Sequence, residues 1–143
     1  MSQGYNLIRA DNKKLLKKFV DFPFQLYQNS GYWVPPIRNE ELTAMLPEKN
    51  PSLLDSEFGY WLVLDGQRVV GRVAGYVNRR DNKLRAREAS RFGSIDFVDD
   101  LSVCRLLLDQ VENWSRDLGM TQIDGPMGPG HFDRNCILID GFE

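Results

Sequence analysis

The stretch RFGSIDFVDDLSVCRLLLDQVENW, Arg91 to Trp114, decides the fold, because it reads as a β-strand that runs directly into an amphipathic helix. Apolar residues in its second half recur at three- and four-residue spacing, and Gly119 provides a stop, so a helix is expected over residues 101–118. Its expected apolar face consists of Leu101, Cys104, Leu107, Leu108, Val111, Trp114 and Leu118. Asp99 and Asp100 lie at the junction, where a helix N-terminus often holds a phosphate, so these two carboxylates need an explanation.

The chain has 143 residues, which predicts a single domain over residues 1–143 with one core. Hydrophobic residues at 42% and charged residues at 27% are close to globular averages and exclude a disordered or fibrous chain. The formal net charge of −2 supplies no basic field for a nucleic-acid backbone or an anionic bilayer. We therefore expect neither nucleic acid nor a membrane as a partner.

The two cysteines, Cys104 and Cys136, form no CxxC pair, and His131 is the only histidine, so no zinc cluster is expected. Each cysteine is interpreted as a reduced core residue rather than a nucleophile, because buried thiols are inert. No apolar run reaches membrane-spanning length, and no export signal precedes the first strand. A cytoplasmic protein is the corresponding expectation.

The region before the junction predicts alternating elements. Residues 5–9 alternate like a strand, Asp11 is placed to cap a helix, and Pro23 fits the first turn of a second, short helix. The clearest signal is a β-hairpin over residues 60–77, whose Asp65-Gly66 pair is typical of a type I′ turn. Gly71 and Gly75 lie inside the second strand, which indicates close packing rather than a phosphate loop.

Beyond the hairpin, residues 78–88 read as a charged connection and residues 90–98 as the strand before the long helix. A short strand over residues 121–125 follows the helix. It leads through the loop GPMGPG into a last apolar strand, CILIDGF, at residues 136–142. This order predicts an α+β fold with a central, mostly antiparallel sheet and helices on both faces.

The order of elements resembles the GNAT N-acetyltransferase superfamily, in which the strands before and after the long helix splay apart to receive acyl-CoA. It is more similar still to one little-characterised GNAT-like family with the segments FP…LY…WVPP, GRVAG and GPM…LLVDGF. Here these read FPFQLYQNSGYWVPPIRNEE, GRVAG and GPMGPGHFDRNCILIDGF. Family members continue past the last segment, so the resemblance implies an N-terminal portion whose sheet is incomplete at the C-terminus. The alternative is a sheet completed by another copy of the chain.

The resemblance also implies a site for acetyl-CoA or another acyl-CoA at the junction. GNAT enzymes place Q/R-x-x-G-x-G/A there, which aligns Asp99 with the Gln/Arg, Ser102 with the first Gly and Cys104 with the Gly/Ala. The expected cofactor contacts are Phe97, Val98, Asp100, Leu101, Ser102, Val103 and Cys104. Like charges about 4 Å apart oppose by roughly 4 kcal/mol at an effective dielectric of about 20, so Asp99 disfavours a pyrophosphate. Helix capping by the acidic pair is the favoured interpretation, and it argues against tight binding of CoA.

Acyl transfer to an amine needs a proton acceptor, and the candidates are Glu57, Asp96 and His131. Two of them have a plainer interpretation, His131 as a surface residue and Asp96 as a polar position in an alternating strand. The residues Tyr32, Trp33, Pro35 and Pro36 either line a groove or pack as a lid on the core. Metal-assisted hydrolysis would require Asp96, Asp99 and Asp100 to converge, and their positions on a strand and a cap diverge.

Two functions follow as hypotheses. The first is an acyl-CoA-dependent N-acyltransferase-like domain with a degenerate pyrophosphate loop and a small-molecule acyl acceptor. The second is a non-catalytic GNAT-like domain that assembles, for example as a homo-oligomer, through an unpaired C-terminal edge strand.

Overall fold

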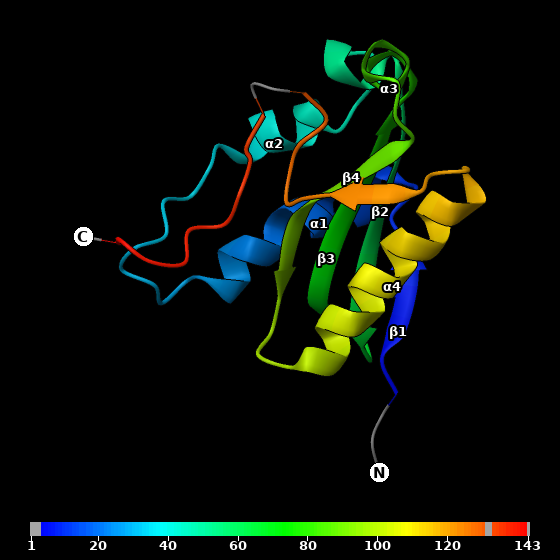
Figure 1. Cartoon of the computed structure of the whole chain (residues 1–143). Coiled ribbons are helices and arrows are strands. Elements are labelled where there is room, and N and C mark those ends of the chain that lie inside the picture. Colours follow the sequence, from blue (N-terminus) through cyan, green and yellow to red (C-terminus); the bar gives the residue numbers. More distant parts are fainter. Residues whose placement is uncertain (1–3, 131–132, 143) are drawn as a thin grey trace.

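The computed structural model describes residues 4–130 and 133–142, and in them a five-stranded sheet carries helices on both faces (Figure 1). The strand order is β1-β2-β3-β4-β5, antiparallel throughout except for the parallel pair β4 and β5. The elements are β1 (Asn6–Arg9), α1 (Lys13–Leu26), α2 (Arg38–Ala44), the 3-10 turn η1 (Pro51–Leu53), β2 (Ser56–Asp65), β3 (Arg68–Asn78), α3 (Arg79–Arg85), β4 (Ala89–Phe97), α4 (Leu101–Asp117) and β5 (Gln122–Asp124). The predicted α+β class with a mostly antiparallel sheet is confirmed.

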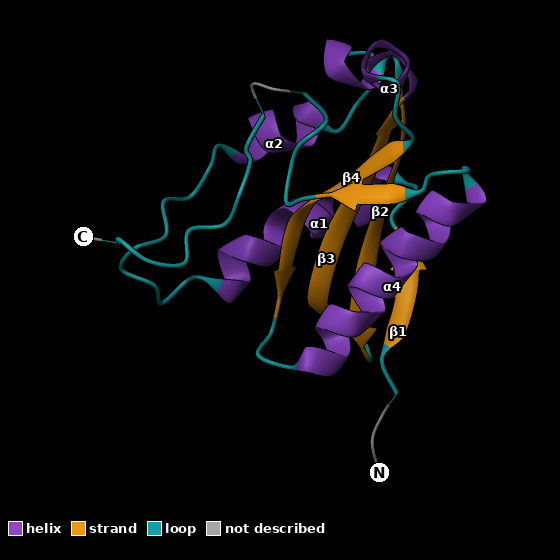
Figure 2. Ribbon diagram, viewed as in Figure 1, coloured by secondary structure: helices purple, strands orange, loops and turns teal. Residues whose placement is uncertain are grey.

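Helix α1 covers one face of the sheet and α4 the other, which Figure 2 shows as helices behind and in front of the strands. Side chains alternate along each strand, so neighbouring residues enter different cores. On β2, Tyr60 and Leu62 pack toward α1, whereas Trp61 and Val63 pack toward α4. The expectation of helices on both faces is therefore confirmed.

The face that α4 turns toward the sheet agrees in part with the predicted one, because Leu107 and Val111 are buried and Trp114 packs against the same core. The buried residues are Val103, Leu107, Val111 and Ser115, which follow each other at four-residue spacing. Leu101 is 71% exposed, so its expected place on the buried face is wrong. The helix nevertheless starts and stops near the predicted residues, because Asp100 caps it and Gly119 adopts a φ of 81° after it.

The two glycines of β3 let α4 pack directly against the strand. A Cβ built on Gly71 would lie 2.6 Å from Cγ1 of Val103, and one on Gly75 would lie 2.9 Å from Cζ3 of Trp114. Both distances are shorter than van der Waals contact allows. The interpretation of these glycines as close-packing residues is confirmed.

The hairpin between β2 and β3 forms as expected, but its turn is displaced by one residue. Asp65 pairs with Arg68, so the two-residue loop is Gly66-Gln67 rather than Asp65-Gly66. Gly66 has a φ of 61°, while Gln67 is not among the residues with positive φ. Since a type I′ turn needs positive φ at both central positions, that turn type was wrong.

Helix α1 is one continuous helix rather than two. Its N-cap is Asn12, whose side chain accepts from the Leu15 amide, so the expected cap at Asp11 was wrong. Pro23 lies inside the helix and is buried. Because proline has no N–H, it leaves the carbonyl of Phe19, four residues earlier, without a helical donor. Nη1 of Arg72 on β3 donates to that carbonyl at 2.9 Å, and this bond replaces the missing one.

The charged connection after β3 contains the short helix α3, which the sequence analysis missed. Asn78 caps it by accepting from the Asp81 amide, and Ala86 ends it with a φ of 51°. Asp81 then forms ion pairs with Arg85 and the buried Arg91, at 2.8 and 3.1 Å. The charged residues of this connection therefore form a helix, and the ion pair of Asp81 with Arg91 holds that helix against β4.

Residues 133–142 form an extended segment rather than the predicted strand over residues 136–142. The segment runs beside the loop between α1 and α2 (Figure 1), where the rings of Tyr32 and Phe142 lie 5.6 Å apart. Several of its apolar side chains are exposed, Ile139 most of all at 88%. In residues 4–130 and 133–142, no helix is both long enough and apolar enough to cross a bilayer.

Candidate functional site

The most developed site lies where β4 and β5 separate. The two strands pair over Ala89–Arg91 and Gln122–Asp124, and the Met127 amide then donates to the Phe92 carbonyl at 2.7 Å. A Cβ on Gly93 would clash with the carbonyl of Met127, so only glycine allows this approach. After Met127 the chain leaves the sheet, and a cavity opens beside β4.

A β-bulge in β4 shapes this cavity. Arg72 and Ala74 of β3 face Asp96 and Gly93 of β4, so β4 contains one extra residue between the paired positions. Ser94 adopts a φ of 47°, a conformation that non-glycine residues rarely take. Its side chain is exposed and lines the cavity. The bulge therefore directs Ser94 into the space that the strand separation creates.

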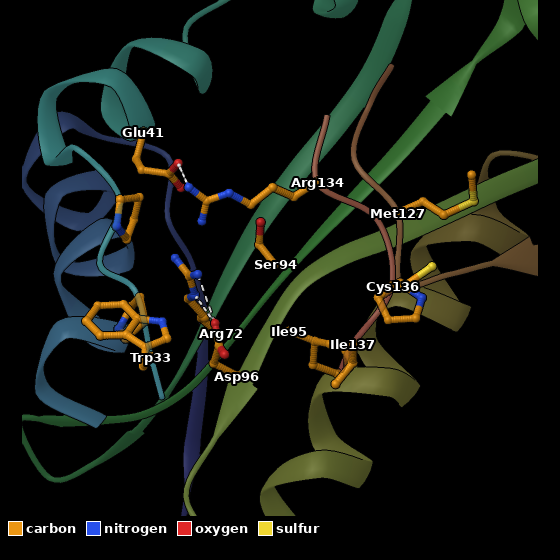
Figure 3. Close-up of a pocket in the computed structure, with 13 residues that line it drawn as sticks. Trp33, Glu41, Arg72, Ser94, Ile95, Asp96, Met127, Arg134, Cys136 and Ile137 are labelled. Carbon is orange, nitrogen blue, oxygen red and sulfur yellow. Dashed lines mark hydrogen bonds and ion pairs between the residues drawn. The ribbon is translucent and has the colours of Figure 1, made fainter. Parts of the chain in front are cut away.

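The cavity has two connected lobes that share Glu41, Arg72, Ser94 and Arg134. The tryptophan lobe, of about 190 Å³, is also lined by Pro23, Trp33, Pro36, Ile95, Asp96, Pro126, Met127, Cys136 and Ile137 (Figure 3). The tyrosine lobe, of about 120 Å³, is also lined by Phe19, Val20, Ala44, Met45, Asn50, Tyr60, Tyr76, Gly128, Pro129 and Asp133. Both lobes are small and mix apolar side chains with charged ones, so they suit a small polar group.

The floor shared by the lobes is a buried polar network. Nε and Nη2 of Arg72 both lie 2.8 Å from Oδ2 of Asp96, and the Tyr27 hydroxyl donates to Oδ1 at 2.6 Å. Burial foremost, and then this hydrogen bond, raise the pKa of Tyr27 above its ordinary value, so Tyr27 remains a donor. Both carboxylate oxygens of Asp96 thus accept hydrogen bonds from protein side chains, which makes Asp96 a poor acceptor for a substrate proton.

An ion pair spans the cavity above this floor. Nη2 of Arg134, on the segment that begins at Asp133, lies 3.2 Å from Oε1 of Glu41 on α2. Figure 3 shows the Arg134 side chain reaching across to Glu41, with Ser94 below the pair. The side chain of Glu41 is 32% exposed and that of Arg134 is 72% exposed. The pair therefore lies at the solvent side of the cavity.

The α4 N-terminus, where the cofactor contacts were predicted, is already bonded within the chain. Oδ1 of Asp100 accepts from the Ser102 amide at 2.8 Å, and Oδ2 accepts from the Tyr5 hydroxyl at 2.6 Å. The Tyr5 bond foremost, and then the Ser102 amide, lower the pKa of Asp100. Capping by Asp100 is confirmed, and Asp99 is exposed beside it.

The other predicted cofactor residues have structural contacts of their own. Phe97 pairs with Gly71, and the amide of Val98 donates to the Val70 carbonyl at 2.9 Å. Leu101 faces solvent, and Val103 is buried against β3.

The amides of Val103 and Cys104 donate to the Asp100 carbonyl, as in an ordinary first helical turn. The thiol of Cys104 is free and half-buried. Contact of these residues with CoA remains a prediction.

The predicted proton acceptors do not come together. Glu57 is half-exposed on β2 and pairs with Arg79 at 2.7 Å. It faces Val77 of β3, whereas Asp96 faces Arg72, so five residues of β3, roughly 16 Å, separate them. His131 lies outside the described residues. Of the three candidates, Asp96 is the one that the structure places in the cavity.

Some of the remaining predicted residues lie in the cavity, and others face solvent. Trp33 and Pro36 line the cavity, whereas Tyr32 is 70% exposed, so WVPP contributes to a groove at two of its positions. Cys136 is exposed rather than a core residue. Among the described residues, no three His, Cys, Asp or Glu side chains gather as a metal site.

Sequence reasoning missed Glu41, Arg72, Arg134 and the two tyrosines Tyr60 and Tyr76. Arg72 had a detectable signal, because a charged residue inside the apolar run RVVGRVAGYV must find a buried partner. Glu41 and Arg134 had none, since both occur in polar stretches where charges normally face water.

No family model matches the chain. Protein YghO of Escherichia coli (strain K12) is 31% identical over 135 residues. Bacterial ceramide synthase of Caulobacter vibrioides (strain NA1000 / CB15N) is 29% identical over 129 residues. The alignments cover 92% and 90% of this chain but 34% of each relative. The chain thus spans about a third of the length of the curated relatives that it matches.

Solved structures resemble the chain at lower identity. A tandem GNAT protein from the clavulanic acid biosynthesis pathway matches with a TM-score of 0.64 and 14% identity, over 89% of this chain and 41% of that one. A GNAT-family acetyltransferase from Staphylococcus aureus Mu50 matches with 0.59 and 18%, over 84% and 72%. AAC(6')-Iy in complex with the bisubstrate analog CoA-S-monomethyl-acetylneamine matches with 0.58 and 12%, over 96% and 97%. With the strand order and the helix on each face, these likenesses identify the chain as a domain with the fold of the GNAT superfamily.

Proposed function

We propose that this chain is an acyl-CoA-dependent N-acyltransferase-like domain that acts on a small-molecule acceptor. The observation that carries the proposal is the cavity at the separation of β4 and β5, which is lined by the bulge residue Ser94 and by charged groups. The complex of AAC(6')-Iy with a CoA-containing bisubstrate analog supports acyl-CoA as the donor. The name of the Caulobacter relative, a ceramide synthase, is consistent with amide formation.

The residues of the α4 N-terminus fit a pyrophosphate only in part. The Ser102 amide is bonded to Asp100, and Asp99 adds a second negative charge beside it. A phosphate must compete with the Asp100 carboxylate for the same donor, so we expect weak binding of CoA. The pyrophosphate loop is degenerate because carboxylates occupy the positions where a phosphate would bind. We place the reactive end of the acyl-CoA at the tryptophan lobe, beside Ser94.

A bound acyl-CoA supplies a thioester carbonyl. Transfer to an amine forms the C–N bond and breaks the C–S bond, the amine proton passes to a base, and the thiolate takes a proton from a donor. Glu41 lines both lobes, and its ion pair with Arg134 involves Oε1 and leaves Oε2 outside that pair. We therefore assign the role of proton acceptor to Glu41. Asp96 instead orients Arg72, and the Ser94 hydroxyl is placed to donate.

A calorimetric titration with acetyl-CoA and with CoA tests this proposal. We expect saturable binding of both at millimolar concentration, followed by acyl transfer to a primary amine at a rate that depends on Glu41. Absence of heat and of a thermal shift at several millimolar of either ligand would end the proposal. A Glu112→Gln variant, whose carboxylate pairs with Arg116 on the exposed side of α4, is the matched control for Glu41→Gln.

The second candidate function is non-catalytic assembly, for example into a homo-oligomer, and the exposed apolar side chains Ile137, Leu138 and Ile139 favour it. Because residues 136–142 form no strand, pairing through a C-terminal sheet edge is corrected to packing through these side chains. Light scattering after size-exclusion chromatography decides this point. A monomer at all concentrations up to the millimolar range would exclude assembly of copies of the chain.

A further inference from the structure

The charges around the cavity are not equally available to a ligand. Arg72 donates to Asp96 and to the Phe19 carbonyl, so the cationic and anionic groups of the floor neutralise each other. Glu41 and Asp133 remain on the walls of the tyrosine lobe, with Arg134 as their cationic counterpart. The charge balance of this lobe therefore depends on the position of Arg134.

Arg134 is held in place by weak restraints. Its guanidinium is largely exposed and pairs with Glu41 on a different element. The neighbouring backbone is bonded to its own loop, since the Cys136 amide donates to the Pro126 carbonyl at 2.8 Å and Asn135 accepts from the Gly128 amide at 3.1 Å. An exposed ion pair of this kind contributes about 0.2–1 kcal/mol, so a ligand cation can displace it.

The tyrosine lobe itself suits a small organic cation. Tyr60 and Tyr76 are 4% and 6% exposed, and their rings, 6.3 Å apart, form an aromatic wall with Phe19. Asp133 lines the same lobe as Tyr76, and burial first, then the charge of Asp133, raise the pKa of the Tyr76 hydroxyl. Oδ2 of Asp133 accepts from the Gly130 amide at 2.6 Å, which leaves Oδ1 for a ligand. Carboxylates beside aromatic faces are the surroundings that bind alkylammonium groups.

We propose that the tyrosine lobe is a subsite for the ammonium group of a primary amine, and that Arg134 is a built-in competitor which occupies Glu41 while the subsite is empty. The amine displaces the guanidinium from Glu41 and leaves its alkyl portion against Tyr60, Tyr76 and Phe19. A lobe of about 120 Å³ holds roughly four water-sized groups, so it takes the ammonium group and the adjacent methylene groups of a short alkylammonium ion. The inference rests on the proposed function in taking this amine as the acyl acceptor.

The test is an amide-resolved NMR titration with n-butylammonium chloride at constant ionic strength, in the absence of CoA. Saturable shifts are expected at Glu41, Tyr76 and Asp133. Arg134→Ala should bind the probe about 1.4- to fivefold more tightly, because the competing ion pair of about 0.2–1 kcal/mol is removed. Glu41→Gln should bind it more weakly by at least the same factor.

Arg116→Ala is the matched control, because Arg116 forms an ion pair of the same length, 3.2 Å, and is similarly exposed, but on α4. Its affinity for butylammonium should equal that of the wild type. Sodium butyrate serves as the anionic probe of equal length and should not shift the same amides. Equal binding of butyrate, an unchanged affinity in Arg134→Ala, or no saturable shifts in any variant would each overturn the proposal.

Together with the calorimetric titration of acetyl-CoA, this experiment separates the inference from the proposed function. Binding of butylammonium without binding of acetyl-CoA would leave the ammonium subsite standing and remove the acyltransferase. Binding of acetyl-CoA without binding of butylammonium would remove the subsite alone.

Discussion

The strand-to-helix unit of β4 and α4 places one carboxylate, Asp100, at the N-terminus of α4 and another, Asp96, in the cavity beside the β4 bulge. The hydrogen-bond partners of the two carboxylates differ. At the helix N-terminus, Asp100 bonds to Ser102 two residues away and to Tyr5, near solvent. In the cavity, Asp96 is held by Arg72 and Tyr27, which are 24 and 69 residues away and largely buried. The first arrangement combines one local bond with one bond from β1 near solvent, whereas the second arrangement pairs a charge with long-range partners in a largely buried position.

This difference affects both stability and function. An exposed cap can be lost at small cost, while a buried charge that loses its partner cannot be solvated. At the helix terminus, the Ser102 amide already donates to Asp100 and is not available to a phosphate. The cavity keeps Glu41, Asp133 and Ser94 at its surface, where a ligand can reach them. The candidate chemistry therefore belongs to the cavity rather than to the helix terminus.

The largest effect is expected from Asp96→Ala, which leaves Arg72 buried without its carboxylate. Removing one partner of a buried pair typically costs about 3–5 kcal/mol, and the free energy of unfolding in urea should fall by that amount. Asp55→Ala is the control, because Asp55 pairs with Arg80 at 3.7 Å with both side chains more than half exposed. Equal losses in the two variants would mean that the cavity floor is no more constrained than the surface.

A smaller loss is expected from Asp100→Ala, which removes the acceptor for the Ser102 amide and for the Tyr5 hydroxyl. Its urea midpoint should lie between those of the wild type and Asp96→Ala. Asp109→Ala, on the exposed side of the same helix, should leave the midpoint unchanged or raise it slightly. An Asp100→Ala loss as large as that of Asp96→Ala would contradict the view that the exposed cap contributes less than the buried ion pair.

The contribution of Asp100 should also depend on pH. Its pKa is lowered in the folded state, so its stabilisation is fully present above the unfolded value of about 3.9 and is lost as the pH falls through the folded pKa. The difference in urea midpoint between wild type and Asp100→Ala should therefore shrink between pH 6 and pH 3. A difference that stays constant over this range would show that the carboxylate charge does not matter.

The smallest effect on stability is expected from Asp99→Asn, because Asp99 is exposed at the junction. Removal of its charge should tighten binding of CoA several-fold, since a like charge about 4 Å from a phosphate costs up to roughly 4 kcal/mol before screening by salt. Calorimetric titration of both proteins at low and at 0.5 M salt measures this. An affinity that does not change at low salt would remove the acidic junction as the cause of weak binding.

The fold was predictable where the signal is local. Helix α4, the hairpin and β4 follow from periodicity and from turn residues, and the α+β class follows from their order. Pro23 shows the limit of such reasoning, because a proline predicts a helix start unless a distant donor, here Arg72, satisfies the carbonyl that it leaves free. The burial of Val103, which the helical pattern did not predict, has a related cause, since Gly71 of β3 leaves room for its side chain.

The candidate site was predictable only at Asp96, Trp33 and Pro36. Glu41 and Arg134 meet across 93 residues, and no pattern in a single sequence reports such a meeting. The bulge at Ser94 was equally hidden, because serine carries no sign of the positive φ that it adopts here. Long-range pairing and backbone strain define the site, and both arise from packing.

An amide-resolved NMR titration with acetyl-CoA tests the central claim most directly, because it compares the cavity and the helix terminus in one experiment. The account predicts saturable shifts at Ser94, Ile95 and Met127, with clearly smaller shifts at Ser102 and Val103. Shifts concentrated at Ser102 and Val103, or no shifts at several millimolar ligand, would contradict it.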